Sequence, residues 1–472
     1  MNTPITNSKP NVIICICDQL RAFEVGCYGN QVIRTPNIDR LAGEGVRFEH
    51  AVSTDPVCMP ARSSLISGQY ARTCMGALGN ASVPDEHGRP IVASWPLQDR
   101  VHLADPTIAE QFKDAGYDTA LIGKWHIHPA PEIVGFDYTL HPRVNHRHTG
   151  QDFVENGGPP QLVDGFSVDY EIENVLSYLA AGRDNPFFLY YSISPPHMPL
   201  ADAPEKYLTM YNPDDMPLRP NVFVDGEMAY DEHWFKVYLW DFLYYSQKLP
   251  YTLDLPEGFD LRTLTALYYG LTTWVDDMIG RMMEGLRANG LLDNTIVVFT
   301  SDHGDNLGSH HRFNKGLLIE ESIRIPMIFH APWLWESGVN SSQVAQLIDI
   351  MPTVLDASEC PVPEHVQGRI LAPILAGECQ QIEENWGFIE TSSGEIGIRT
   401  PTYLLGRNTS GSEGAEENRP TSFYDLRDDP FELNNLAGTG EQAEVESELD
   451  DLLTAWDRDT PWMRTSESKA AG

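Results

Sequence analysis

Buried strands and amphipathic helices alternate along most of the chain. The run VIICIC at residues 12–17 is bounded by polar residues and is typical of a strand covered on both faces. Similar apolar runs lie at 119–122, 186–193 and 295–300, and helical patterns lie at 36–44, 107–115, 171–181 and 263–286. This alternation predicts an α/β fold with a large, mainly parallel sheet flanked by helices on both faces.

Polar side chains follow these predicted strands at the point where each strand ends. Six residues share this position: Asp18, Lys124, His126, His197, Asp302 and His303. In open α/β sheets, ligands bind at the carboxyl edge of the strands. A single such residue would be unremarkable, but six at one edge predict a functional site.

Two regions depart from the alternation. Residues 199–260 are rich in Pro, Asp, Tyr and Trp without a clean period, which predicts an insertion over the site rather than a domain. The C-terminal segment changes to short β-like pieces, a Gly/Ser/Glu-rich loop at 408–418 and a final acidic helix near 441–456. We therefore predict a catalytic α/β domain over 1–382 and a small α+β domain over 383–472.

Two dipeptides at the strand ends, Asp18-Gln19 and Asp302-His303, predict a metal site. Their two carboxylates, amide and imidazole could ligate one divalent cation, and this oxygen-rich set suits calcium, magnesium or manganese better than zinc. The alternative is that both aspartates cap the helices that follow them. Capping does not require the polar neighbour that each aspartate has, so we favour the metal.

The chain has 472 residues and a formal net charge of −36. This charge argues against binding nucleic acid through a basic face. An anionic substrate must be held by a few local cations or by a metal, against an unfavourable mean field. We interpret most of the acidic excess as a solubility adaptation to a salty habitat.

The seven cysteines include no CxxC pair, so neither a disulfide framework nor a zinc ribbon is predicted. Cys15 and Cys17 share one face of the first strand and are predicted to pack in the core of a protein from a reducing compartment. No run of eighteen apolar residues predicts a transmembrane helix. The N-terminal residues MNTPITNSKPNVII lack the pattern of a signal peptide, so we expect a cytoplasmic protein without a membrane partner.

The stretch STDPVCMPARSSLISGQY, residues 53–70, places Cys58 two residues before a proline and four before an arginine. A disulfide partner, a zinc ligand, a thiol nucleophile and a buried structural cysteine are all compatible with this position taken alone. The remainder of the chain has to decide among them.

The motif CMPAR, followed by SSLISGQY, resembles the C-x-P-x-R signature of the type I sulfatases in the alkaline phosphatase superfamily. Further segments agree with this family in its order along almost the whole chain, among them GYDTALIGKWHI, SPPHMPL, SDHGDNLGSHHRFNKGLLIEESIRIPMI and SFYDLRDDPFELNNLAG. The chain also resembles the phosphonate monoester hydrolases. The resemblance implies an alkaline-phosphatase-like fold.

The resemblance also implies that Cys58 is oxidised after translation to formylglycine, whose hydrate is a geminal diol. One hydroxyl attacks sulfur and displaces the alcohol, and the other then expels the sulfate, whereas a serine would leave a stable sulfate ester. Pro60 and Arg62 belong to the sequence that a formylglycine-generating enzyme reads. The alternative is an unmodified Cys58 at a helix start, with a lowered pKa.

Carried over residue by residue, the resemblance assigns five metal ligands: Asp18, Gln19, modified Cys58, Asp302 and His303. Many relatives have aspartate in place of Gln19 and asparagine in place of His303. The site here is therefore less anionic, so manganese or magnesium become stronger alternatives to the expected calcium.

The resemblance also assigns roles in catalysis. Lys124 and Lys315 match the lysines that hold the anionic ester oxygens, where charge stabilisation is expected to matter most. Arg62 is expected to hydrogen-bond the formylglycine, and His126 to support its hydroxyl. His197 matches a histidine that protonates the leaving oxygen.

Four further residues are predicted to bind substrate: Asn80, His310, Arg143 and His148. Asn80 resembles a pocket asparagine of the phosphonate monoester hydrolases, and His310 lies in the loop leading to Lys315. Arg143 and His148 belong to the basic cluster HPRVNHRHTG, which could bind a carboxylate or a second sulfate of a sugar. The alternative for this cluster is a solvated loop.

We predict a sulfuric ester hydrolase acting on sulfated carbohydrates. A phosphonate monoester or phosphodiester hydrolase with the same nucleophile is the alternative, because a monoanionic sulfate and a monoanionic phosphonate ester look alike to two lysines. A catalytically silent binding protein is disfavoured by the complete set of ligands, lysines and modification motif. The predicted partners are a small-molecule or oligosaccharide sulfate ester and the formylglycine-generating enzyme, and a homo-oligomer is compatible with the chain.

Overall fold

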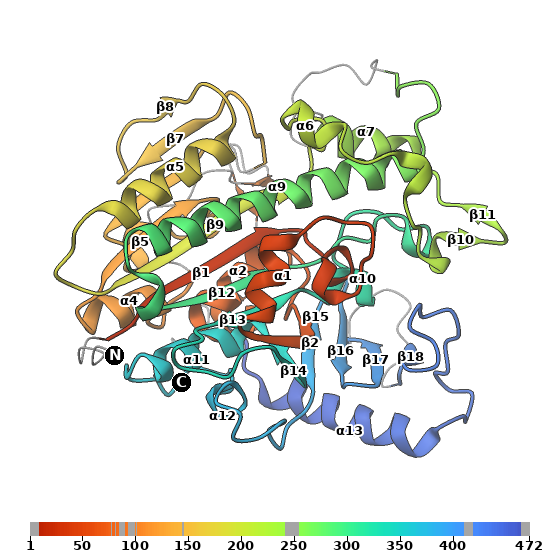
Figure 1. The fold of residues 1–472 in the computed structure, drawn as a ribbon. Helices are drawn as coiled ribbons and strands as arrows, with labels where there is room; N and C mark the ends of the chain where they lie inside the picture. Colours follow the sequence, from red (N-terminus) through yellow and green to blue (C-terminus); the bar gives the residue numbers. More distant parts are fainter. Residues whose placement is uncertain are drawn as a thin grey trace.

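The central element of the fold is a ten-stranded mixed sheet, seen in a computed structural model that describes residues 9–76, 78–80, 82–84, 90–92, 100, 102–143, 146–240, 254–409 and 419–463. Within these residues the strand order is β14-β2-β13-β12-β1-β9-β5-β6-β7-β8 (Figure 1). The bounds are β1 Asn11–Asp18, β2 Val46–Val52, β5 Asp118–Gly123, β6 Tyr138–Pro142, β7 Asp152–Glu155, β8 Gln161–Leu162, β9 Phe187–Pro196, β12 Thr295–Ser301, β13 Met327–His330 and β14 Val339–Gln346. β1 pairs in parallel with β9 and β12, β5 with β6 and β9, and β2 with β14. The predicted mixed, mainly parallel sheet is thus confirmed.

Strand β1 lies in the middle of the sheet and is buried on both faces. Its residues alternate between two hydrophobic cores, with Cys15 and Cys17 in one and Ile14 and Ile16 in the other. The first core includes helices α1 Pro36–Gly43, α5 Ser167–Ala180 and α9 Leu261–Ala288, and the second includes α2 Cys58–Ser67, α4 Ile108–Asp114 and α11 Ile350–Ala357. Helices therefore cover both faces of the sheet, as predicted.

Capping side chains mark where two of these helices begin. Thr107 Oγ1 accepts the backbone N–H of Glu110, and the Glu110 carboxylate accepts the N–H of Thr107, which forms a capping box at the start of α4. Asp260 Oδ1 accepts the N–H of Thr263 at the start of α9. In the described part of the chain, no helix is both long and apolar enough to cross a membrane.

The segment predicted as an insertion contains short elements at the right of Figure 1, and α6 among them packs on α9. They are α6 Glu205–Leu208, β10 Phe223–Val224, β11 Glu227–Met228 and α7 Glu232–Trp240. Phe235 and Tyr238 of α7 are buried in the same core as α9. Residues 241–253 of the segment lie outside the described residues.

The C-terminal segment forms an antiparallel sheet, ordered β15-β16-β17-β18, with one helix packed against it. The bounds are β15 Gly387–Glu390, β16 Glu395–Arg399, β17 Tyr403–Asn408, β18 Ser422–Asp425 and α13 Ala443–Asp459 (blue in Figure 1). Arg399 Nε lies 3.0 Å from Glu320 Oε1 and joins this sheet to the short helix α10 Glu320–Ile323. The small α+β unit is as predicted, while the boundary at 382/383 stays a prediction. Residues 410–418 of the predicted loop lie outside the described residues.

Candidate active site

The nucleophile predicted from the sequence lies at the first turn of α2, and every residue of this helix is buried. Cys58 Sγ is 3.2 Å from His303 Nε2, 2.9 Å from Lys315 Nζ and 3.7 Å from Asp18 Oδ1. The N-terminal end of a helix favours negative charge. Cys58 therefore occupies a position where cations and a helix dipole converge on one atom.

The predicted metal ligands gather around this sulfur. The ligand atoms of Asp18, Cys58, Asp302 and His303 all lie within 4.8 Å of one another, and all four residues are buried. Two ligands on opposite sides of a calcium ion stand about 5 Å apart, since each bond is about 2.3–2.6 Å long. The donor atoms thus have a spacing that fits one divalent cation, and two of the four are carboxylate oxygens.

Two cationic side chains hold the outer oxygens of the two aspartates. Arg62 Nη2 donates to Asp18 Oδ2 at 3.0 Å, and Arg62 Nε donates to Asp302 Oδ2 at 2.8 Å. Lys124 Nζ also donates to Asp18 Oδ2. The inner Oδ1 atom of Asp18 is left facing Cys58 and His303. Arg62, predicted to act on the nucleophile, therefore also aligns both carboxylates.

Hydrogen bonds fix the orientation of His303 and Gln19 beside Cys58. His303 Nδ1 lies 2.8 Å from the carbonyl oxygen of Gly304, a contact that requires an Nδ1–H, so in the neutral ring Nε2 is the nitrogen that can ligate a cation. Gln19 Oε1 accepts a hydrogen bond from Lys315 Nζ at 3.0 Å. Gln19 has φ 65° directly after β1, so its side chain leaves the strand direction.

Three histidines form a cluster beside these ligands. His197 Nε2 is 3.9 Å from Asp18 Oδ1, and the His197 Nδ1–H donates to the carbonyl oxygen of Met198 at 2.7 Å. His146 stacks on His197 with ring centroids 3.9 Å apart, and its Nδ1 is 3.3 Å from Lys124 Nζ. The His126 ring centroid lies 5.5 Å from that of His146.

The charges in the site shift the acidity of its members. Burial by itself would raise the pKa of Cys58, but Lys124, Lys315 and His303 outweigh it and hold that pKa well below its ordinary value. Burial, together with Lys315, lowers the pKa of His197 to about 4, so this imidazole is neutral near pH 7. The site thus favours a negative charge at position 58 and a neutral base beside it.

The four predicted substrate-binding residues have different surroundings. Asn80 is exposed, and its Oδ1 accepts the backbone N–H of Met59, next to Cys58. Arg143 is exposed, with its backbone bonded to Asp152. His148 is buried, and its Nδ1 is 2.7 Å from the carbonyl oxygen of Asp202. This structural contact gives no support to a substrate role for His148, which stays a prediction.

His310 lies in a different cluster, together with Glu321 and Glu432. Its Nε2 is 3.2 Å from Asn221 Nδ2, which also donates to Glu321 Oε1 at 2.8 Å. The sequence motif placed His310 near Lys315 along the chain, but its side chain contacts the junction between the insertion and the C-terminal segment.

His146 belongs to the same basic cluster as Arg143 and His148, for which the sequence predicts binding of a carboxylate or a second sulfate. Periodicity in a loop does not tell which of its two histidines, His146 or His148, contacts Lys124 at the strand ends. The structure places His146 there.

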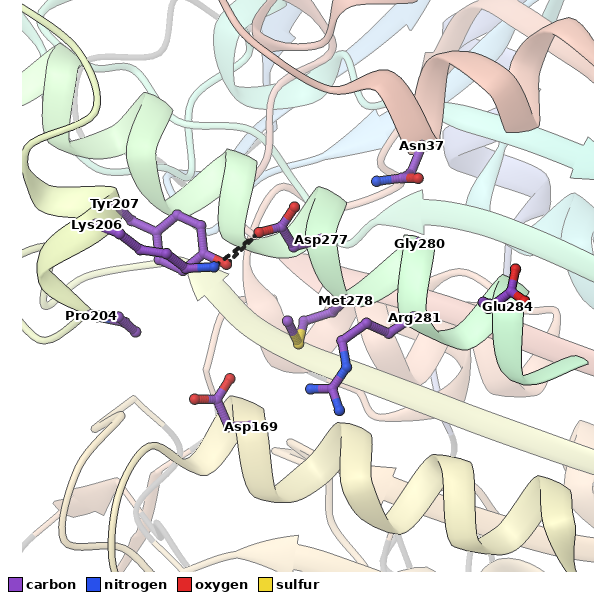
Figure 2. Close-up of a pocket in the computed structure, with 10 residues that line it drawn as sticks. All are labelled: Asn37, Asp169, Pro204, Lys206, Tyr207, Asp277, Met278, Gly280, Arg281 and Glu284. Atoms are coloured by element: carbon purple, nitrogen blue, oxygen red, sulfur yellow. Dashed lines mark hydrogen bonds and ion pairs between the residues drawn. The ribbon is translucent and has the colours of Figure 1, made fainter. Parts of the chain in front are cut away.

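A surface pocket of about 510 Å³ lies apart from these residues, between α1, α5, α6 and α9 (Figure 2). It is lined by Asn37, Asp169, Pro204, Lys206, Tyr207, Asp277, Met278, Gly280, Arg281 and Glu284. Tyr207 and Lys206 both bond Asp277 on its wall. The lining includes none of the residues predicted for the site.

Known proteins match the chain over nearly its whole length. The family described as Sulfatase matches residues 10–359, and the family described as N-sulphoglucosamine sulphohydrolase, C-terminal, matches residues 308–459. The ulvan-active sulfatase of Formosa agariphila is 30% identical, over 94% of this chain and 80% of its own length.

Solved structures share the fold. The structure of BT4656 in complex with its substrate D-glucosamine-2-N,6-O-disulfate is 25% identical, has a TM-score of 0.77 and covers 96% of this chain and 99% of its own. The phosphonate monoester hydrolase of Agrobacterium radiobacter is 22% identical, with a TM-score of 0.71 and 96% of each chain covered. The predicted alkaline-phosphatase-like fold is confirmed by these likenesses.

Proposed function

The chain belongs to the sulfatase family of the alkaline phosphatase superfamily and is a hydrolase of that class, and we propose that it cleaves sulfate esters of carbohydrates with a formylglycine made from Cys58. The observation that supports this most is the environment of Cys58 Sγ. The sulfur is buried at a helix start, 2.9 Å from Lys315 Nζ and 3.2 Å from His303 Nε2. An oxygen nucleophile in the place of this sulfur would stand between a cation and the metal ligands.

Formylglycine explains why a cysteine occupies this position. A formylglycine-generating enzyme would read Cys58 with Pro60 and Arg62, and it would replace the thiol by an aldehyde. When hydrated, the aldehyde supplies two hydroxyls on one carbon, one to attack sulfur and one to release the sulfate. Arg62 is already bonded to Asp18 and Asp302, so in the folded enzyme it supports the ligands of the site as well.

A divalent cation fits the residues beside the nucleophile. Asp18, Gln19, Asp302 and His303 would hold it, and we propose calcium because three of these four donors are oxygens, with manganese and magnesium as alternatives. When bound, the cation would favour the ionised form of the nucleophile and neutralise charge on the ester. The outer oxygens of both aspartates stay with Arg62, so the ligands are oriented before the cation arrives.

Lys124 and Lys315 supply the positive charge that the transferred group requires. Both lie within the buried site of a chain whose net charge is −36, so they act locally against an unfavourable mean field. His197 is neutral near pH 7, and its Nδ1–H is used by Met198. Its Nε2 therefore first accepts the proton of the attacking formylglycine hydroxyl and then donates a proton to the leaving oxygen.

Sulfated carbohydrates are the substrate class that we propose. BT4656, with 25% identity and a shared fold, has a sulfated glucosamine as its substrate. Among the basic cluster, we propose His146 as the residue closest to the bound ester, because it contacts both Lys124 and His197. Asn80, bonded at the start of α2, is the second candidate.

The test begins with the protein produced together with a formylglycine-generating enzyme. A mass spectrum of the peptide that contains Cys58 should show the thiol replaced by an aldehyde, and the protein should turn over nitrophenyl sulfate and sulfated monosaccharides. An intact thiol with no turnover would overturn the proposal. Faster hydrolysis of a phenyl phosphonate monoester than of any sulfate would favour the alternative substrate class.

A further inference from the structure

The side-chain amide of Gln19 has two ends that differ in chemistry. Its Oε1 can ligate a cation, whereas its NH₂ group donates hydrogen bonds and cannot. A half-turn about the last side-chain bond exchanges the two ends and would present the NH₂ group to the cation. An aspartate or glutamate in the same place would present an oxygen either way. A glutamine ligand therefore needs neighbours that select one orientation.

The neighbours of Gln19 make this selection at both ends. Gln19 Nε2 donates to Asp305 Oδ2 at 2.5 Å and to Asn314 Oδ1 at 3.3 Å. Gln19 Oε1 accepts from Lys315 Nζ at 3.0 Å, and an ammonium group can only donate. Asn314 is itself an amide that could present either end, so at the Nε2 end the carboxylate of Asp305 is the neighbour that selects the orientation.

Asp305 is itself held in place from the side away from Gln19. It is buried, and its Oδ1 accepts the backbone N–H of Leu307 at 2.8 Å and the hydroxyl of Tyr238 at 2.6 Å. The Tyr238 oxygen accepts the backbone N–H of Asn314 at 2.6 Å, so its own proton is directed to Asp305. Oδ2 of Asp305 is thereby turned toward Gln19.

We propose that Asp305 is a positioning residue of the metal centre, which orients the Gln19 amide with its oxygen toward the cation, and that Tyr238 of α7 holds Asp305 for this purpose. The inference rests on the proposed metal centre. It links the insertion that contains α7 to a metal ligand at the end of β1. Partners of metal ligands typically change metal affinity by about 10–100-fold when they are removed.

The test is a calcium titration, followed by calorimetry, of the full chain with unmodified Cys58, so that its outcome does not depend on turnover. Asp305→Asn should weaken calcium binding by about 10–100-fold, because the new amide can donate as well as accept and no longer selects one orientation. Tyr238→Phe should weaken it by about three- to tenfold, since one hydrogen bond to Asp305 is lost. Tyr207→Phe is the matched control, because Tyr207 is a buried tyrosine of the same segment whose hydroxyl bonds Asp277 outside the site.

A second ligand variant distinguishes a role of Asp305 in orienting the Gln19 amide from a general role in stabilising the fold. In a Gln19→Glu background the ligand presents an oxygen in either orientation, and the amide that Asp305→Asn introduces can donate to it. Asp305→Asn should then leave calcium binding unchanged or strengthen it. An equal loss in both backgrounds, or an unchanged affinity of Asp305→Asn alone, would overturn the proposal. Thermal unfolding of each variant checks that it is folded, and Tyr238→Phe carries the test if Asp305→Asn is not.

The same titration distinguishes this proposal from that of the metal centre. If the unaltered chain binds calcium and Asp305→Asn binds it equally well, only the positioning role fails. If the unaltered chain binds neither calcium nor manganese, both fail.

Discussion

Two clusters in the described part of the chain combine carboxylates with an imidazole. One contains Asp18, Asp302 and His303 together with Cys58, and the other contains His310, Glu321 and Glu432. In both, the ligand atoms lie within 4.8 Å of one another, and the carboxylates are buried. Residue types and spacing therefore do not distinguish them.

The difference lies in where the neighbouring cations bind. At the sheet edge, Arg62 takes the outer oxygens of Asp18 and Asp302, and the inner oxygen of Asp18 stays turned toward Cys58. Burial alone would raise the pKa of Asp18, but Lys124, His197 and Lys315 hold it well below its ordinary value. The ionised carboxylate of Asp18 thus faces Cys58 and His303.

At the second cluster, other protein groups already bond the carboxylates. Arg219 Nε is 2.5 Å from Glu321 Oε1, and Glu432 Oε2 accepts the backbone N–H of Glu320. Burial, followed by the nearby Glu321 and Glu320 carboxylates, raises the pKa of Glu432 well above its ordinary value. This shift favours the protonated form of Glu432, and we interpret the cluster as a junction between the insertion and the C-terminal segment. A carboxylate can ligate a metal only if protein cations and donors leave one of its oxygens available, and residue types alone do not show this.

The largest effect is expected at the nucleophile of the first cluster. Cys58→Ser in the co-expressed protein should reduce steady-state turnover of nitrophenyl sulfate by about 10⁴-fold or more. Serine has a single hydroxyl and cannot expel the sulfate that it accepts. A mass spectrum should show a sulfated serine, and turnover within tenfold of the unaltered enzyme would contradict the formylglycine mechanism.

Removal of metal should affect only the first cluster. Treatment with a chelator should abolish activity, calcium should restore it, and elemental analysis should find one divalent cation per chain. Asp302→Asn should abolish this binding, because it removes an anionic ligand and leaves Arg62 buried without one partner. Glu432→Gln should leave the stoichiometry at one, and a second cation lost in this variant would refute the contrast between the clusters.

The second cluster should instead respond in stability. Glu321→Gln leaves the mostly buried Arg219 without its carboxylate and should lower the free energy of unfolding by about 3 kcal/mol. Denaturant unfolding measures this change. Glu432→Gln is the matched control, with an expected change within about 1 kcal/mol at neutral pH, because the raised pKa of Glu432 favours an uncharged side chain, which glutamine also has.

The smallest effect is a pH dependence of stability. The raised pKa of Glu432 means that the folded state binds its proton more tightly than the unfolded state, whose pKa is near the ordinary 4.5. Its contribution to stability is therefore largest below about pH 4.5 and falls as the pH rises to the folded pKa. Glu432→Gln should remove this decline, and parallel stability curves for both proteins would show that Glu432 is ionised when folded.

Much of the fold could be predicted because it depends on local patterns. The helix predicted at 263–286 is observed as α9 at 261–288, extended because Asp260 caps its start. The strand ends that carry Asp18 and Asp302 converge because β1 and β12 are parallel neighbours. The contact between Gln19 and Asp305 could not be predicted in this way. Asp305 lies 286 residues from Gln19 along the chain, in the loop that follows β12.

The sequence by itself determined the α/β architecture and the residues at the strand ends, and the CMPAR motif together with the other family segments indicated the sulfatase family and the proposed nucleophile. These follow from periodicity and from residues that lie close together along the chain. Only the tertiary structure decided that His146 rather than His148 contacts Lys124, that His310 belongs to a junction, and which way the Gln19 amide points. Each of these depends on hydrogen bonds between distant segments, and their directions are set only when the segments pack.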